Sequence, residues 1–441
     1  MRQDRALLRL VLLVSCAHAM VHLLEQSFAS VELTVSAELG LSKAQSGRLG
    51  TALRFPYGFG ALLAGIISDR LGSRRILLVY LAGGALVCGS MVLNNGHALL
   101  YVQLFLLGSF ASMYHPAGLA LLTTSAPASL RGRALGIHGV FGSAGIALAP
   151  FIAGVTLMAQ PNGWRWYYLV LGGLGMLLAS QFRRDFDTTE SQRANQALST
   201  SGARNAEQRL KIAPFAVLTM ATAIAGIVYA GFLHFLKRYL SERFLDEADI
   251  VAGAVTDRAD LVIAATQQVV ATSNEVVSAS VTATGTDASS SMYTAITLAC
   301  GALGQWIAGQ IARPGRLPLQ LSLIFASNAP LLLWMTVAHG NARVIAAGLF
   351  AFVHFMNQPV YNSLLPEFIP AHRRSTWFGF SNMMGFGIGS FGPAIVGELG
   401  DFRQAYFVLA ILALVAAALP LTLYLFVRHE DSTPDSSAAS R

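Results

Sequence analysis

Charged residues are scarce in this sequence. Asp, Glu, Lys and Arg make up only 12% of the 441 residues, against about a quarter in a soluble domain, while hydrophobic residues make up 54%. Apolar runs of about 20 residues recur from end to end, and a helix of that length spans the hydrocarbon core of a bilayer. This composition excludes a soluble globular domain and predicts an all-α polytopic membrane protein.

Cysteine is also rare, and motifs for catalysis are missing. The three cysteines, Cys16, Cys88 and Cys300, all lie in apolar runs, where we interpret them as small apolar filler. No disulfide framework, metal-ligand spacing or cofactor is predicted from them. The chain has no HExxH motif, nucleophile elbow or phosphate-binding loop, so an enzyme is not expected.

The apolar runs predict twelve transmembrane helices. Most of the 30 Lys and Arg residues fall in the connections that face the cytoplasm if the N-terminus does. This bias predicts that both termini are cytoplasmic. The membrane itself is expected to be the inner membrane of a bacterium. It also accounts for the net charge of +7 without a nucleic-acid partner. The predicted spans are 7–37, 46–69, 75–94, 97–124, 131–158, 164–183, 213–240, 291–312, 317–338, 342–366, 373–397 and 403–427.

The second half of the chain repeats the first. Pro116 corresponds to Pro359 and Pro150 to Pro393, at one constant offset of 243 residues. Glycines and arginines match at the same offset, so the correspondence indicates an internal repeat. Because an even number of spans separates the copies, both have the same orientation. Parallel six-helix repeats are one known architecture of secondary transporters.

The repeat divides the chain into parts. We expect an N-terminal bundle of six helices over 1–183 and a C-terminal bundle over 213–428. A polar cytoplasmic linker, 184–212, joins them, and the tail 429–441 is expected to be disordered. An extracytoplasmic insertion, 246–290, repeats valines every seven residues, which favours an amphipathic helix or helical hairpin. It is a structural appendage, a disordered segment or a docking site for a protein partner.

The loop after the second span carries a specific motif, "GIISDRLGSRR". It resembles the signature loop of the major facilitator superfamily, which implies two six-helix bundles that rock around a central cavity. Its aspartate can accept from helix N-terminal amides and pair with arginines, and so latch the cytoplasmic side. The alternative is that these charges only set topology. The matching residues are Asp69, Arg70, Gly72, Arg74 and Arg75.

Span 5 resembles the antiporter motif of the same superfamily. Gly145 precedes "APFIAG", which contains Pro150, although alanines replace two glycines that are usual there. Helix packing through small residues is the alternative interpretation. The first half also resembles the fosmidomycin-resistance-type branch, through His22 with Glu25, "SKAQSGRL", His115-Pro116 and "VFGSAGIALAP". It departs from that branch at Ala117 and at Glu25-Gln26.

Polar residues inside the predicted spans are the candidate functional residues, because a charge at a span centre costs about 2.5–3.5 kcal/mol on insertion scales. We expect Glu25 to pair with Arg54 or His22 and to line the outer half of the central cavity. A glutamate so placed can load and release a proton as the cavity alternates. A static buried ion pair is the alternative.

The remaining candidates are less specific. His115, His138, Gln358 and Asn382 complete the expected cavity residues, with helix packing as the alternative for each. Pro116 and Pro359 are expected to bend spans 4 and 10 at matching points. Gln358 replaces His115 in the second half, so the histidine is peculiar to the first. Lys237 and Arg238 are expected to extend from span 7 to the membrane interface.

These features predict a monomeric secondary transporter that exports a small polar or amphipathic molecule in exchange for protons. Uptake by symport is the alternative within the same fold. A rival from another class is a non-transporting sensor or assembly scaffold that uses the insertion 246–290 as its docking element.

Transport predicts that Glu25→Gln and Asp69→Asn each abolish net flux without abolishing expression, because one removes the titratable carboxylate and the other the latch. The measurement is substrate flux in proteoliposomes with an imposed pH gradient. Full activity of both variants, together with loss of function on deletion of 246–290, would favour the scaffold instead.

Overall fold

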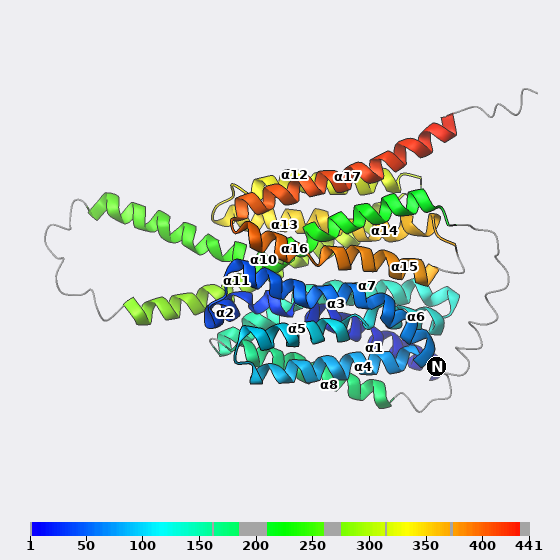
Figure 1. Ribbon diagram of the computed structural model, residues 1–441, viewed down its shortest axis with the longest axis horizontal. Helices are drawn as coiled ribbons and strands as arrows, with labels where there is room; N and C mark the ends of the chain where they lie inside the picture. Colours follow the sequence, from blue (N-terminus) through cyan, green and yellow to red (C-terminus); the bar gives the residue numbers. More distant parts are fainter. Residues whose placement is uncertain are drawn as a thin grey trace, which may run out of the picture.

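The computed structural model describes residues 2–160, 163–184, 210–259, 275–313, 315–370 and 374–432 (Figure 1). Within these ranges every regular element is helical, which confirms the predicted all-α class. Nine helices or helix pairs among them are long and apolar enough to cross a membrane. The other three predicted spans coincide with α8, with α11 and with the pair α15 and α16, whose bounds follow.

The first half forms six spans, and two of them are built from two helices each. Span 1 is α1 and α2, span 4 is α5 and α6, and single helices form the others. The elements are α1 (Arg2–Glu25), α2 (Ser27–Leu39), α3 (Lys43–Leu71), α4 (Ser73–Ser90), η1 (Met91–Leu93), α5 (His97–Ala111), α6 (Tyr114–Ser125), α7 (Ala128–Ala159) and α8 (Trp164–Arg184).

The second half has the same order of spans, but span 7 is one unbroken helix where span 1 is two. Span 11 contains a π-helical segment, and the helices of spans 7 and 8 are unusually long. The elements are α10 (Ile212–Ala259), α11 (Glu275–Ile311), α12 (Leu317–Met335), α13 (Asn341–Phe355), α14 (Asn357–Leu364), η4 (Leu365–Glu367), α15 (Arg374–Asn382), η6 (Met383–Ile388), α16 (Gly392–Leu399) and α17 (Phe402–Ser432).

Both ends of the predicted insertion are continuations of transmembrane helices. α10 runs on to Ala259 and α11 begins at Glu275, and both project beyond the bundle in Figure 1. Residues 260–274 lie outside the described residues. Most of the expected linker, 185–209, and the end of the tail, 433–441, lie outside them too, whereas α17 extends helically to Ser432.

The halves have separate hydrophobic cores. One core is made by side chains of α1 to α8, from Val11 to Phe182, and the second half packs its own. Across the boundary, α7 packs against α11 and α3 against α16. The N-terminus and the last turns of α17 lie at one end of the bundle, the terminal end. The loop that follows α2 lies at the opposite, distal end (Figure 1).

Spans 4 and 10 break at matching points, as the sequence predicts. Each break, at Met113 and at Met356, lies three residues before a proline of the repeat. Proline has no N–H to donate, and its ring clashes with the carbonyl of the preceding turn. Both methionine amides therefore bond three residues back, Met113 to Phe110 and Met356 to Val353, each at 3.2 Å.

The signature loop is a one-residue turn between α3 and α4. Gly72 has a φ of 88°, and its counterpart Gly315 has a φ of 78°, a left-handed region that favours glycine. Arg70 and Arg75 are exposed. The side chain of Asp69 lies outside the part that the structure describes, so its role as a latch stays a prediction.

Close helix contacts account for Gly145 in span 5. A Cβ at this position would lie 2.4 Å from the carbonyl oxygen of Ala19 in α1. Pro150 is buried inside α7, which remains continuous around it, and Pro393 lies in the first turn of α16 just after the π-helical segment. The small residues of span 5 thus make room for α1.

Gly145→Ala is expected to destabilise the bundle by about 1–3 kcal/mol, because the added methyl group overpacks the contact with α1. Gly136→Ala in the same helix is the matched control, since nothing lies within 4 Å of a Cβ there. The measurement is the Tm of each purified variant in detergent. Equal Tm values would contradict the packing argument.

Candidate functional site

The carboxylate of Glu25 is the centre of a buried polar network. Glu25 is the last residue of α1 and only 1% exposed. One oxygen accepts from Nδ1 of His22 at 2.8 Å, and the other accepts from Nη1 of Arg54 in α3 at 2.7 Å. Both contacts expected from the sequence are therefore present at once.

A helix break positions this carboxylate. Span 1 is interrupted at Gln26, between α1 and α2, directly after Glu25. Ser27 donates its hydroxyl to the carbonyl of Leu24 at 2.8 Å, and the carbonyl of Gln26 accepts from both the backbone amide and the hydroxyl of Ser30. In a membrane such carbonyls must find internal donors, so the serines make the break tolerable.

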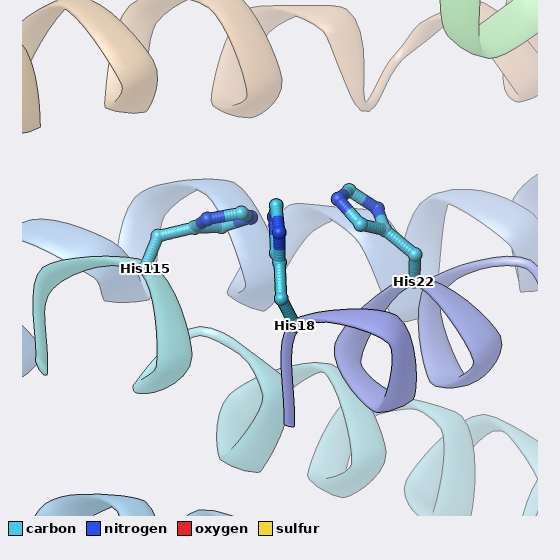
Figure 2. A group of neighbouring side chains, drawn as sticks. All are labelled: His18, His22 and His115. Carbon is cyan, nitrogen blue, oxygen red and sulfur yellow. The ribbon is translucent and has the colours of Figure 1, made fainter. Parts of the chain in front are cut away.

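Histidines from three helices surround the same position. His18 lies one turn before His22 in α1, His115 comes from α6 and His138 from α7 (Figure 2). The ring of His18 stacks on that of His138 with centroids 3.9 Å apart, and lies 4.9 Å from His22 and 5.4 Å from His115. The packing of α1 against α6 and α7 creates this group.

Hydrogen bonds hold each ring of this group. Nδ1 of His18 donates to the carbonyl of His138 at 2.7 Å. Nε2 of His115 lies 2.8 Å from the hydroxyl of Tyr57, and Nε2 of His138 lies 3.0 Å from that of Tyr114. His18 and the two tyrosines were not among the residues singled out from the sequence. His18 carried a usable signal, because it shares a helix face with His22.

The network borders the second half of the protein. Phe386 of the π-helical segment stacks on His115 with centroids 6.1 Å apart. The guanidinium carbon of Arg54 lies 5.9 Å from the ring centroid of Tyr229 in α10. Any movement of one half against the other therefore changes the surroundings of this network.

The candidates of the second half lie elsewhere. Gln358, exposed in α14, accepts from Nε2 of Gln305 in α11 at 2.8 Å, and Gln305 also bonds with Ser143 of α7. Asn382 is half-buried at the end of α15. The structure thus brings together His22, Glu25, Arg54, His115 and His138, but it does not bring Gln358 or Asn382 into that network.

A second group of buried charges joins the halves at the distal end. Arg238 pairs with Glu32 of α2 at 2.6 Å, and Lys237, only 1% exposed, donates to the carbonyl of Ser30 at 2.8 Å. Lys237 also forms an ion pair with Asp287 of α11. The expectation that Lys237 and Arg238 extend to the membrane interface was wrong, because buried acceptors in span 1 and α11 satisfy them instead.

More exposed contacts add to this closure. Lys43 donates to the carbonyl of Gly400 at 2.9 Å, and Arg48 pairs with Glu398 at 2.5 Å. Both contacts connect α3 with the end of α16 at the distal side. The described ion pairs and hydrogen bonds thus close the distal end of the boundary between the halves.

Comparison with known proteins identifies the family. Residues 14–393 match the family model of the Major Facilitator Superfamily. The chain belongs to the Major Facilitator Superfamily. This membership agrees with the signature loop and with the repeated six-helix halves.

Relatives in this superfamily have diverse names. The probable sulfoacetate transporter SauU of Cupriavidus necator is 29% identical over 40% of this chain and 41% of its own length. A putative metabolite transport protein of Haemophilus influenzae is 23% identical over 86% of this chain and 87% of its own. The quinolone resistance transporter of Acinetobacter baumannii is 28% identical over 33% of this chain and 35% of its own. The resemblance to the fosmidomycin-resistance-type branch stays a prediction.

Solved structures share the fold. A bacterial homologue of the human lysosomal transporter Spinster, in an inward-facing and occupied conformation, matches with a TM-score of 0.66, at 14% identity over 97% of this chain and 98% of its own. A mutant of the nucleoside transporter NupG matches with a TM-score of 0.65, at 12% identity over 94% of this chain and 99% of its own. At these identities the likeness concerns the fold alone.

Glu32→Gln is expected to open the distal end, because removing one partner of a buried ion pair costs about 3–5 kcal/mol. The background is a chain whose native cysteines are replaced and that carries Ser46→Cys, at a buried position. The measurement is the rate at which a membrane-impermeant maleimide labels this cysteine. We expect labelling to become at least about tenfold faster.

The matched control is Glu398→Gln, which removes an exposed ion pair of the same end. Exposed pairs contribute little, so labelling at position 46 should change by less than about threefold. If both variants label alike, the buried pair is not what closes the distal end.

Proposed function

We propose that this protein is a proton-coupled secondary transporter that exports a small polar or amphipathic solute by alternating access. In this proposal the terminal end faces the cytoplasm and the protein is a monomer in the inner membrane of a bacterium. The mutual geometry of Glu25, His22 and Arg54 carries the proposal. Uptake by symport uses the same parts with the opposite direction of solute movement.

The carboxylate of Glu25 has what proton coupling needs. It is buried, so a proton on it is shielded from both aqueous phases, and its two oxygens have separate partners on different helices. Protonation would remove its charge and weaken the contact with Arg54 by an electrostatic term that is large where water is excluded. The positive charge of Arg54 would then lack a partner. An anionic group of the solute or another acidic side chain can take that place.

Arg54 also offers a contact for the solute. Its Nη2 atom is buried and has no hydrogen-bond partner among the described residues. A buried donor without a partner is costly, so an oxygen of a bound solute would be stabilised there. Two relatives are named as a probable sulfoacetate transporter and a probable L-galactonate transporter, which supports a polar solute. Two others are named for puromycin resistance and quinolone resistance, which supports export.

Alternating access requires the distal contacts to break and re-form. Glu32, Arg238 and Lys237 hold the distal end closed in this arrangement. If the halves rock about the central network, these pairs separate and the signature loop at the terminal end becomes the closing contact. The distal pairs are formed in one state and the contacts of the signature loop in the other, so only one side of the solute site opens at a time.

A scaffold function is the second candidate. It is favoured by the projection of α10 and α11 beyond the bundle at the distal end, in the region 246–290 (Figure 1). A protein partner that docks there would leave the central network without a role. Transport gives the central network a function in proton coupling, so we prefer transport to the scaffold.

Glu25→Gln is expected to abolish solute accumulation driven by a pH gradient but to retain solute exchange at equal pH. Glutamine keeps the shape and a hydrogen-bond acceptor, while the proton can no longer be loaded or released. The measurement is a panel of organic acids and drug-like cations in proteoliposomes, comparing net flux with counterflow.

Glu38→Gln is the matched control on the same span. Its carboxylate pairs with Arg165 at 2.7 Å and accepts from Trp164, but it is not part of the central network. It should retain both modes of transport. Undiminished accumulation by the Glu25 variant would refute proton coupling at this residue.

A further inference from the structure

Three histidines converge on one point within the first bundle. One ring nitrogen from each of His18, His22 and His115 lies within 4.8 Å of the other two. The side chains of His18 and His22 rise from adjacent turns of α1, and that of His115 reaches over from α6 (Figure 2). One nitrogen of each ring therefore lies near a common point, while each ring also has a hydrogen-bond partner of its own.

Among the described residues, hydrogen bonds leave one ring nitrogen free in each histidine: Nε2 in His18 and His22, which bond through Nδ1, and Nδ1 in His115, which bonds to Tyr57 through Nε2. A carbonyl and a carboxylate can only accept, so Nδ1 carries the proton in both His18 and His22. Each Nε2 then keeps its lone pair. Metal-ligating histidines are commonly oriented in this way, with the other ring nitrogen donating to a carboxylate or a backbone carbonyl.

We propose that His18, His22 and His115 bind a divalent transition-metal ion of the Zn²⁺ type through one ring nitrogen each. Neutral imidazole is a preferred ligand of Zn²⁺, Cu²⁺ and Ni²⁺, and three histidines leave a fourth position for water or a solute oxygen. Tetrahedral coordination at about 2.0–2.1 Å places ligand nitrogens roughly 3.3 Å apart. In the proposed site the ring nitrogens, now within 4.8 Å of one another, would have to approach to that distance.

The outer partners complete the case for a metal rather than for histidine packing alone. Glu25 holds His22 and brings a negative charge to a site that would gain a cation, while Arg54 on its other oxygen keeps the carboxylate fixed. The backbone of His138 holds His18, and its ring supports that of His18 from the side. These groups are the outer shell that a bound ion needs for orientation.

The site lies where an ion would contact both halves of the protein. Phe386 of the second half stacks on His115 with centroids 6.1 Å apart, so one of the proposed ligands contacts the other half of the protein. The inference concerns binding of the ion and does not depend on the direction or the proton coupling of transport. The chain can therefore bind the ion without being a proton-coupled exporter, and it can be such an exporter without binding the ion.

Zn²⁺ binding by the full chain, purified in detergent and stripped with a chelator, tests the proposal by isothermal titration calorimetry. We expect one Zn²⁺ ion per chain. His18→Gln, His22→Gln and His115→Gln should each weaken binding at least about tenfold, because each removes one of three ligands. The glutamine at 115 is the residue that the repeat carries at Gln358.

His354→Gln is the matched control, because His354 is equally buried in the membrane region but bonds with Asn328 of the second half at 3.0 Å. It should bind Zn²⁺ as the unmodified chain does. The proposal is overturned if the unmodified chain binds no stoichiometric Zn²⁺, or if the variant lacking all three histidines binds it equally well.

A spectroscopic measurement on the unmodified chain covers the case in which a variant does not fold. Co²⁺ replaces Zn²⁺ in such sites and gives intense visible absorption when it is four-coordinate. We expect these bands to appear and to saturate at one ion per chain, and to vanish when Zn²⁺ is added. Weak bands of six-coordinate Co²⁺ at every ratio would overturn the proposal.

Discussion

A charge that is buried in a membrane must be paired within the protein, and this constraint organises the structure. Glu25, Glu32 and Lys237 are all nearly inaccessible to solvent, and each has a partner from another helix. An unpaired charge at such depth costs several kcal/mol. The partners therefore fix how span 1 sits against span 2 in one half and against span 7 in the other.

The two groups of charges differ in what they connect. The pair of Glu25 and Arg54 lies within the first half, so it can persist while the halves move. The pair of Glu32 and Arg238 joins the halves and must break if the distal end opens. Placing both acids on the two helices of one broken span couples the central network mechanically to the distal closure. Backbone hydrogen bonds from Gln26 to His22 and from Ser30 to Gln26 connect the two segments across the break.

Much of the fold could be predicted from the sequence. Spans 4 and 10 break three residues before Pro116 and Pro359, and Gly72 and Gly315 turn in the same left-handed conformation, because the repeat reproduces local backbone chemistry. The contacts of Glu25 with His22 and Arg54 could also be anticipated. His22 shares a helix face with Glu25, and Arg54 lies at a similar depth in the next span. The side chain of Asp69 is not described, so the latch remains a prediction.

Local chemistry thus determined the helices, their breaks, the repeat and the scarcity of charge that places the chain in a membrane. Only the tertiary structure decided which distant side chains meet. The histidine group needs α6 and α7 to pack on α1, and His115 is nearly 100 residues from His18 along the chain. Lys237 and Arg238 sit where snorkelling is the simplest expectation, yet both bond to acceptors from the other half, and Lys237 is buried. Such pairings depend on helix packing and cannot be predicted from the spacing of residues along the sequence.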